Sequence, residues 1–262
     1  MTYVIYLFLG VFAGTLSGLF GIGGGLVIVP TLLFCFKFLG FSAENAIHMA
    51  IGTSLSIIVI TASNSVYSHN KRGSIDWKVV KKLLIPLIIG TFLGGLASSK
   101  LSASFLEMAF SIYVVLVSIK MFLDVKVDKV ERDTSTFLYS LVGALIGFKS
   151  AILGIGGGTI SIPFLSWRGF PMKKAVGVSA ALGLPISIVG TTSYIISGLK
   201  VTGLPEHSLG YIYLPAFIGV ILTSAFSAHL GAKLSHKLPQ DKMKKGFAVF
   251  LSIVAIKMIF FS

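Results

Sequence analysis

Two glycine-rich pentapeptides with the same sequence, GIGGG, have the residue types and spacing that could bind an anion. They occupy residues 21–25 and 154–158, and a proline follows each at the same distance, at Pro30 and Pro163. Successive glycine amides can converge on one point to form an anion-binding nest, and a helix that begins nearby adds its positive end. Proline is favoured in the first turn of a helix. We therefore expect two unwound segments that end at the prolines.

Polar side chains near these clusters complete the set of residues that we expect to bind a small anion. The hydroxyls lie at equivalent places in two similar segments, AIGTSL at 50–55 and AVGVSA at 175–180. The expected substrate-binding residues are Gly23, Gly24, Gly25, Gly156, Gly157, Gly158, Thr53, Ser54, Ser179, Lys149 and Asn64. Structural roles are the alternatives, because hydroxyls in membrane helices also bond their own backbone, and amides and glycines also serve helix packing.

Lys149 carries a full charge inside an apolar segment. It lies five residues before Gly154, in a segment that starts near Thr136. At about 1.5 Å per residue, it is roughly 20 Å along its helix. A lysine that faces lipid at such a depth costs roughly 3 kcal/mol or more, so it should face a cavity or a partner. We predict that Lys149 supplies positive charge to the substrate. The alternatives are a structural pair with Glu107 or with carbonyls, and exposure to water in a tilted segment.

His69 is the candidate for proton coupling. It is followed by Asn70, Lys71 and Arg72 at a predicted cytoplasmic mouth, where an imidazole can exchange protons near neutral pH. An ordinary surface histidine is the alternative. The carboxylates lie in loops or near segment ends, and the chain has no metal-ligand spacing and no nucleophile paired with a base. We therefore expect no metal, no cofactor and no enzymatic activity.

The composition predicts that these residues lie in an all-α polytopic membrane protein. Apolar residues make up 55% of the 262 residues and charged residues only 12%, which is too apolar for a soluble domain. Apolar stretches long enough to span a bilayer recur along the chain. They are approximately 3–20, 46–66, 79–98, 104–123, 136–153, 175–197, 208–230 and 244–261, with shorter apolar pieces at 26–39 and 159–167.

The basic residues give the expected orientation in the membrane. The net charge is +13, and most of the lysines and arginines fall in four loop stretches. Their confinement to loops argues against nucleic-acid binding. By the positive-inside rule, the four stretches are cytoplasmic. The prediction is a multi-pass protein of the inner membrane, embedded in the lipid bilayer, with both termini external.

The two halves of the chain are similar in sequence but opposite in loop charge. The loop at 69–82 is strongly basic, whereas its counterpart at 198–207 holds one lysine and one glutamate. This pattern is typical of two inverted-topology repeats, an architecture common among transporters. We expect repeat 1 at 1–123, a cytoplasmic linker at 124–135 and repeat 2 at 136–262. Each repeat would contain a Gly-rich unwound segment, whose flanks either cross the membrane or form a re-entrant hairpin.

These motifs together resemble the TauE/SafE family of sulfite and organosulfonate exporters. The resemblance covers the whole chain. It rests on the paired GIGGG…P motifs, Gly52-Thr53-Ser54 with Gly177-Val178-Ser179, HNKRGSIDW at 69–77 and LGYIYLPA at 209–216. It implies a secondary transporter of small sulfur-containing or carboxylated anions. Lys149, and Val178 where the first half has Thr53, depart from the expected pattern.

The expected function is therefore anion transport by alternating access around a midplane site between the two GIGGG motifs. An anion channel is the alternative within transport. A membrane enzyme or receptor is the alternative outside it. The sequence leaves open the substrate, the direction of transport, the coupling ion and the oligomeric state, with a homodimer among the alternatives.

Overall fold

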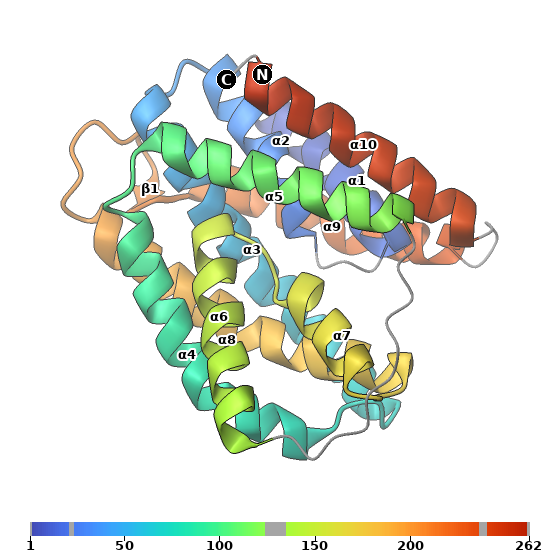
Figure 1. Cartoon of the computed structure of the whole chain (residues 1–262). Helices are drawn as coiled ribbons and strands as arrows, with labels where there is room; N and C mark the ends of the chain where they lie inside the picture. Colours follow the sequence, from blue (N-terminus) through green and yellow to red (C-terminus); the bar gives the residue numbers. More distant parts are fainter. Residues whose placement is uncertain (1, 21–23, 124–134, 236–239, 261–262) are drawn as a thin grey trace.

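The computed structural model describes residues 2–20, 24–123, 135–235 and 240–260 (Figure 1). This part of the chain forms α-helices and one short β-hairpin. The helices are α1 (Thr2–Phe20), α2 (Gly25–Phe38), α3 (Ala43–Lys71), α4 (Trp77–Ser98), α5 (Ala103–Leu123), α6 (Thr136–Leu153), α7 (Gly158–Trp167), α8 (Met172–Gly198), α9 (Leu214–Ser235) and α10 (Gln240–Phe260). The hairpin pairs β1 (Ser208–Leu209) with β2 (Ile212–Tyr213).

The all-α, multi-pass membrane prediction is confirmed. Within the described residues, α3, α4, α5, α6 and α8 are long enough and apolar enough to cross a membrane. The expected span at 208–230 is wrong in its first part, because residues before Leu214 form the hairpin. His207 and Gly210 have positive φ values of 64° and 56° there, which a helix does not accommodate. The predicted linker at 124–135 lies, except for Ser135, outside the described residues.

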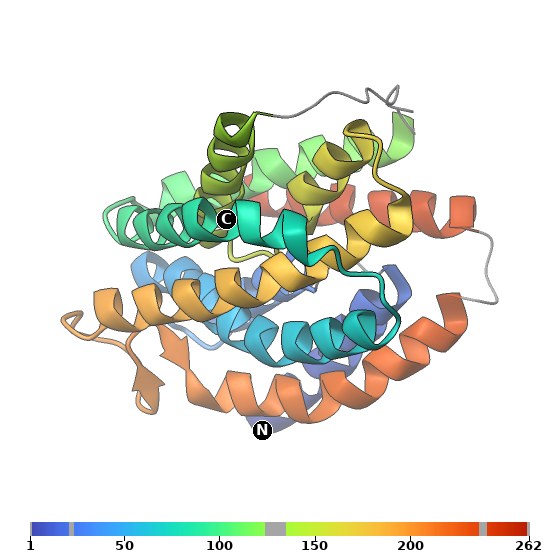
Figure 2. The same ribbon diagram turned by 90° about the horizontal axis from the view of Figure 1, so that it is seen from below.

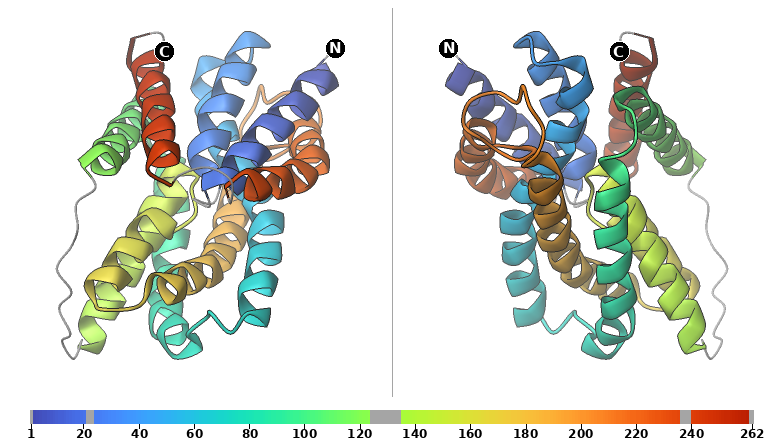
Figure 3. Two further views of the ribbon diagram at one scale, coloured as in Figure 1. Left: turned by 90° about the vertical axis from the view of Figure 1, so that its right-hand side faces the viewer. Right: turned by 90° about the vertical axis from the view of Figure 1, so that its left-hand side faces the viewer.

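The second GIGGG cluster separates two helices that turn back on each other. Helix α6 ends at Leu153, and Gly154 follows it with a left-handed φ of 66°. In Figure 1, α6 runs toward the middle of the molecule and α7 turns back from it. Figure 3 shows α1 and α2 doing the same from the opposite end. Each hairpin of helices therefore reaches only part of the way through the molecule.

The two prolines do not begin helices, contrary to the sequence prediction. Pro30 lies inside α2 and Pro163 inside α7, each five residues after the helix has begun at a glycine. Each helix gives up only the one backbone hydrogen bond that a proline cannot donate. The glycines alone, with no side chains to favour a helical conformation, mark where the helices break.

Helices from the two halves pack closely through small residues. Helix α1 lies along α9, α4 along α6, and α5 along α10. A Cβ atom on Gly10 or Gly14 would overlap Thr223 or Ser227, so this part of the GxxxGxxxG pattern serves packing. The long helices α3 and α8 lie side by side through the middle (Figure 2). Their facing sides therefore line the centre of the molecule.

Candidate functional site

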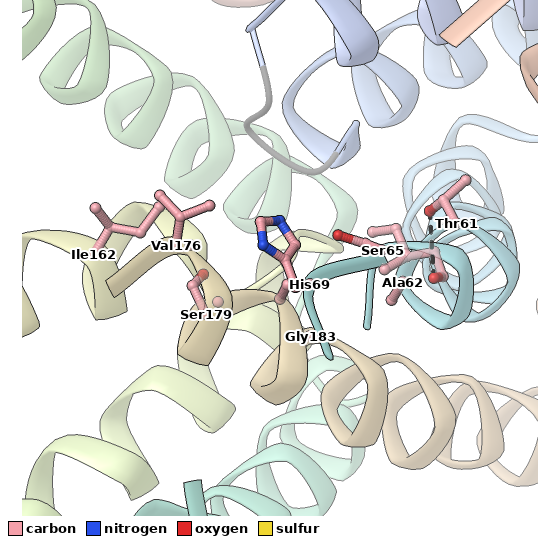
Figure 4. A pocket seen from close by; sticks show the side chains of 13 residues that line it. Thr61, Ala62, Ser65, His69, Ile162, Val176, Ser179 and Gly183 are labelled. Carbon is pink, nitrogen blue, oxygen red and sulfur yellow. Dashed lines mark hydrogen bonds between the residues drawn. The ribbon is translucent and has the colours of Figure 1, made fainter. Parts of the chain in front are cut away.

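A cavity of about 180 Å³ lies between α3, α7 and α8 (Figure 4). Three of the glycines expected to bind the substrate, Gly156, Gly157 and Gly158, form part of its wall. Ser179 of α8 and His69 of α3 also line it. The fold therefore brings together residues from the second GIGGG cluster, from the GVS segment and from the end of α3.

The glycine wall presents backbone amides rather than side chains. Among the described residues, no carbonyl accepts a hydrogen bond from the amides of Gly156 and Gly157. The Gly157 carbonyl accepts from the amides of Ile160 and Ser161 at 3.2 and 2.9 Å, so α7 starts immediately after this point. A Cβ on Gly156 would meet no atom within 4 Å. The unpaired amides and the positive end of α7 could together bind a small anion.

Ser179 is the expected hydroxyl that faces the cavity. Its Oγ lies 3.1 Å from the position of a Cβ on Gly158 and makes no hydrogen bond to any residue that the structure describes. Figure 4 shows its side chain beside Val176 and His69. The hydroxyl could therefore donate a hydrogen bond to a bound oxyanion without first breaking an internal one.

Thr53 and Ser54 lie outside this cavity and bond to the backbone instead. The Thr53 Oγ1 accepts a hydrogen bond from the amide of Tyr213 at 3.0 Å. The Ser54 hydroxyl donates to the Gly154 carbonyl at 2.9 Å. Both side chains are fully buried. These two hydroxyls therefore connect α3 to the hairpin and to the second glycine cluster.

The first GIGGG cluster packs against the second. A Cβ on Gly25 would lie 2.8 Å from the Gly154 carbonyl oxygen and 2.8 Å from the Ile155 Cα. Gly24 caps α2 with a φ of 65°. Gly23 lies outside the described residues. Asn64 is exposed and does not line the cavity. The two clusters thus meet, and among their described residues only those of the second border the cavity.

His69 is half-buried and held by the turn after α3. Its Nδ1 lies 3.0 Å from the Ser74 Oγ, and the Ser74 hydroxyl donates to the His69 carbonyl at 2.9 Å. Because that hydroxyl has one proton, Nδ1 must be the donor to it. The Nε2 atom then carries the lone pair of the neutral imidazole. His69 could therefore take up a proton at Nε2 at the edge of the cavity.

Lys149 contacts an aromatic ring rather than a carboxylate. Its Nζ lies 3.4 Å from the centre of the Tyr113 ring on α5, a cation–π contact. The alternative of a pair with Glu107 is wrong, because Glu107 accepts an ion pair from Lys37 at 2.9 Å. Lys149 does not line the cavity. It lies one turn before α6 ends at the second glycine cluster.

The sequence reasoning missed Thr61 and Ser65, which line the cavity from α3. Thr61, Ser65 and His69 follow one another at intervals of four residues, which places all three on one face of a helix. This spacing is the sequence signal by which Thr61 and Ser65 could have been found. No group of three metal-ligating side chains occurs in the described part of the chain.

Comparisons with known proteins match nearly the whole chain to membrane transporters. A family model described as sulfite exporter TauE/SafE matches residues 6–258. A probable membrane transporter protein of Haemophilus influenzae is 43% identical over 256 residues, covering 97% of this chain and 97% of the relative. A probable membrane transporter protein of Methanocaldococcus jannaschii is 29% identical over 257 residues, covering 97% and 94%.

The helical membrane fold and these relatives define the class of protein, a multi-pass membrane transporter. Within that class, the chain belongs to the TauE/SafE family.

Proposed function

We propose that the protein is a secondary transporter that moves small anions by alternating access around the cavity between α3, α7 and α8. The observation that carries the proposal is the wall at Gly156 and Gly157, whose amides donate to no carbonyl among the described residues, with the Ser179 hydroxyl beside it. Sulfite, organosulfonates and short carboxylates present the oxygen atoms that such donors bind. An anion channel and a membrane enzyme or receptor are the competing functions.

Lys149 would contribute a fixed positive charge near this wall. It approaches the second glycine cluster from α6, and its ammonium group lies over the Tyr113 ring. A contact with a ring leaves the charge uncompensated, unlike a contact with a carboxylate. The positive potential would therefore extend to the neighbouring amides and favour an anion there.

Two inverted repeats, at 1–123 and 136–262, would supply the moving parts. The packing supports this proposal because helices at complementary positions in the two halves pack on each other. Helix α1, the first of its half, packs on α9, the fourth of the other half; α6 packs on α4 in the same relation. Movement of one half against the other would expose the central site to the two sides in turn.

The cavity would open toward the cytoplasmic side of the inner membrane. The turn after α3 adjoins it and carries exposed Lys71 and Arg72. Lys174 at the start of α8 donates to the Gly73 carbonyl at 3.2 Å, so a third basic residue lies against this turn. The positive-inside rule makes this end cytoplasmic, and it makes both termini external.

A pair of matched valine variants tests the site. Gly156 lines the cavity, and a Cβ there would meet no atom within 4 Å; a Cβ at Gly246 on α10, away from the cavity, would also meet nothing within 4 Å. Gly156→Val should abolish binding of sulfite, sulfonates and carboxylates to the purified protein, while Gly246→Val should leave it unchanged. Equal binding by both variants would overturn the site. In proteoliposomes, saturable and strongly temperature-dependent flux would favour a carrier over a channel.

A further inference from the structure

His48 is a buried histidine whose two ring nitrogens both face backbone carbonyls. It lies near the start of α3, away from the cavity, and its exposed fraction is 4%. Its Nδ1 is 3.1 Å from the carbonyl oxygen of Glu44, one turn earlier. Its Nε2 is 3.2 Å from the carbonyl oxygen of Ser98, at the end of α4.

This geometry favours the protonated imidazole. A carbonyl oxygen can only accept a hydrogen bond, and a neutral imidazole has a single N–H donor. In either neutral tautomer, one nitrogen lone pair would point at a carbonyl oxygen in a site that excludes water. The imidazolium ion has two donors and satisfies both carbonyls with charge-assisted hydrogen bonds. The surroundings of His48 are therefore those of a proton-binding site.

The same imidazole contacts the hairpin that covers this end of α3. The ring of Tyr211 stacks on it with centroids 5.1 Å apart and planes 23° from parallel, an arrangement that favours a cation. The Tyr211 carbonyl lies 2.9 Å from the position of a Cβ on Gly52, and the Tyr211 amide donates to the Tyr194 carbonyl at 3.3 Å. His48 thus joins α3 and the end of α4 to the hairpin, and the hairpin contacts α8.

We propose that His48 binds a proton that keeps the β1–β2 hairpin packed on α3, so that this end of the transporter, the hairpin end, stays closed. His48 releases the proton when the β-hairpin separates from α3. The proposal rests on the proposed alternating access. Since the proton binds more tightly in the closed form, closure is favoured at low pH and weakens as the pH rises. By linkage, each opening of this end releases the proton.

The other titratable groups around His48 are consistent with this assignment. Glu44 on α3 is an exposed carboxylate that favours a positive imidazole. Tyr211 in the hairpin and Tyr194 on α8 are neutral near pH 7. Lys100, after α4, is exposed and opposes the charge in water-screened surroundings. Lys37 and Glu107 form an ion pair with each other in the neighbouring cavity that Glu44 also lines.

Thiol labelling at different pH values tests the proposal. In a Cys35→Ser background, Ile212→Cys places a thiol in the hairpin at a position only 3% exposed, and Thr202→Cys places one on the surface. The ratio of their labelling rates cancels the pH dependence of thiol ionisation. The ratio should rise about fivefold or more between about pH 5 and about pH 8, the range in which histidine titrates. A ratio that does not change with pH would overturn the proposal.

Two histidine variants assign the effect to His48. His48→Gln keeps a nitrogen donor group in a side chain that does not titrate, so it should give a flat ratio. His207→Gln, an exposed histidine in the same loop as the hairpin, should keep the wild-type response. A wild-type response in His48→Gln would contradict the proposal. Labelling needs no substrate. If the wild-type ratio is flat but the protein still binds and transports anions, the proposal for His48 fails and the proposed transport function stands.

A protein with His48 as its sole histidine gives a second measurement if His48→Gln does not fold. The other histidines, replaced by glutamine, are His69, His207, His229 and His236. The ¹⁵N spectrum of the ring should show two protonated nitrogens at about pH 6. A neutral ring at about pH 5 would overturn the assignment.

Discussion

Two equivalent segments, Gly52–Ser54 on α3 and Gly177–Ser179 on α8, each support a loop that follows the other long helix. The Tyr211 carbonyl lies against Gly52, and the Ser74 carbonyl lies against Gly177. The middle residue differs. Thr53 accepts a hydrogen bond from the Tyr213 amide, whereas Val178 has no polar atom to offer the turn that contains Ser74.

The last residue of each segment differs in a second way. The Ser54 hydroxyl is used within the protein, on the Gly154 carbonyl, and the Ser179 hydroxyl faces the cavity. The Gly52–Ser54 segment therefore holds the β-hairpin through Thr53 and the second glycine cluster through Ser54, and neither hydrogen bond has an equivalent at Val178 or Ser179 among the described residues. One hydroxyl in an otherwise repeated segment is enough to make the two ends unequal.

The strongest contrast is expected from the same substitution in the two glycine clusters. Gly25→Val should prevent folding, because its Cβ would lie 2.8 Å from backbone atoms of Gly154 and Ile155 that cannot move aside. In Gly157→Val, the Cβ would meet side-chain methyl groups of Ile146 and Ile186, each at 2.9 Å, and no backbone atom, so this variant is the milder of the two. It should fold and lose anion binding. Size-exclusion chromatography and binding assays measure both, and normal binding by Gly157→Val would show that the glycines only serve packing.

Labelling in intact cells tests which end is cytoplasmic. In the Cys35→Ser background, Thr202→Cys near the hairpin should react with an impermeant thiol reagent, and Lys71→Cys at the cavity end should not. Both positions are exposed, so their labelling should differ only because the reagent reaches one side of the membrane. The difference should be about tenfold or more if the positive-inside rule holds. Equal labelling, or the reverse order, would remove the case for inverted repeats.

Exchanging Thr53 and Val178 between the segments should change how firmly the hairpin is held. Thr53→Val removes the half-buried hydrogen bond that Thr53 accepts from the Tyr213 amide, at a cost of about 1 kcal/mol or more. Labelling of Ile212→Cys should accordingly rise about tenfold, since about 1.4 kcal/mol corresponds to that factor. Val178→Thr, introduced into the protein that carries Ile212→Cys, should leave the labelling of that cysteine unchanged. No increase in Thr53→Val would mean that its hydrogen bond does not hold the hairpin.

The smallest effect is expected at Lys149, which has no counterpart in the first half, where Leu16 takes the equivalent place. Lys149→Met should weaken anion affinity about three- to tenfold, the effect of one partly screened charge of about 1 kcal/mol. Lys149→Arg should keep part of the affinity, because it retains the charge over the Tyr113 ring. Isothermal titration of the folded variants measures this. Unchanged affinity in Lys149→Met would assign the lysine to a structural role.

The sequence by itself determined the membrane class, the helices and the places where they break. The apolar stretches predict helices because backbone groups in a bilayer must bond within their own segment. The GIGGG clusters predict breaks because glycine does not favour a helix. These are local properties of a few neighbouring residues. The sequence also brought Gly156, Gly157, Gly158 and Ser179 into one candidate site, and the fold places them around one cavity.

Only the tertiary structure decided the partners of the polar side chains. Lys149 meets Tyr113 and Glu107 meets Lys37, whereas the sequence left a pair between Lys149 and Glu107 open as an alternative. His48 reaches the carbonyl of a residue 50 positions away, and Thr53 reaches an amide 160 positions away. Such contacts depend on how helices from distant parts of the chain pack. That packing is determined jointly by the glycines between helices and by the shapes of the other side chains. A hydroxyl or imidazole has the same local sequence signal whether it faces a cavity, a carbonyl or the solvent.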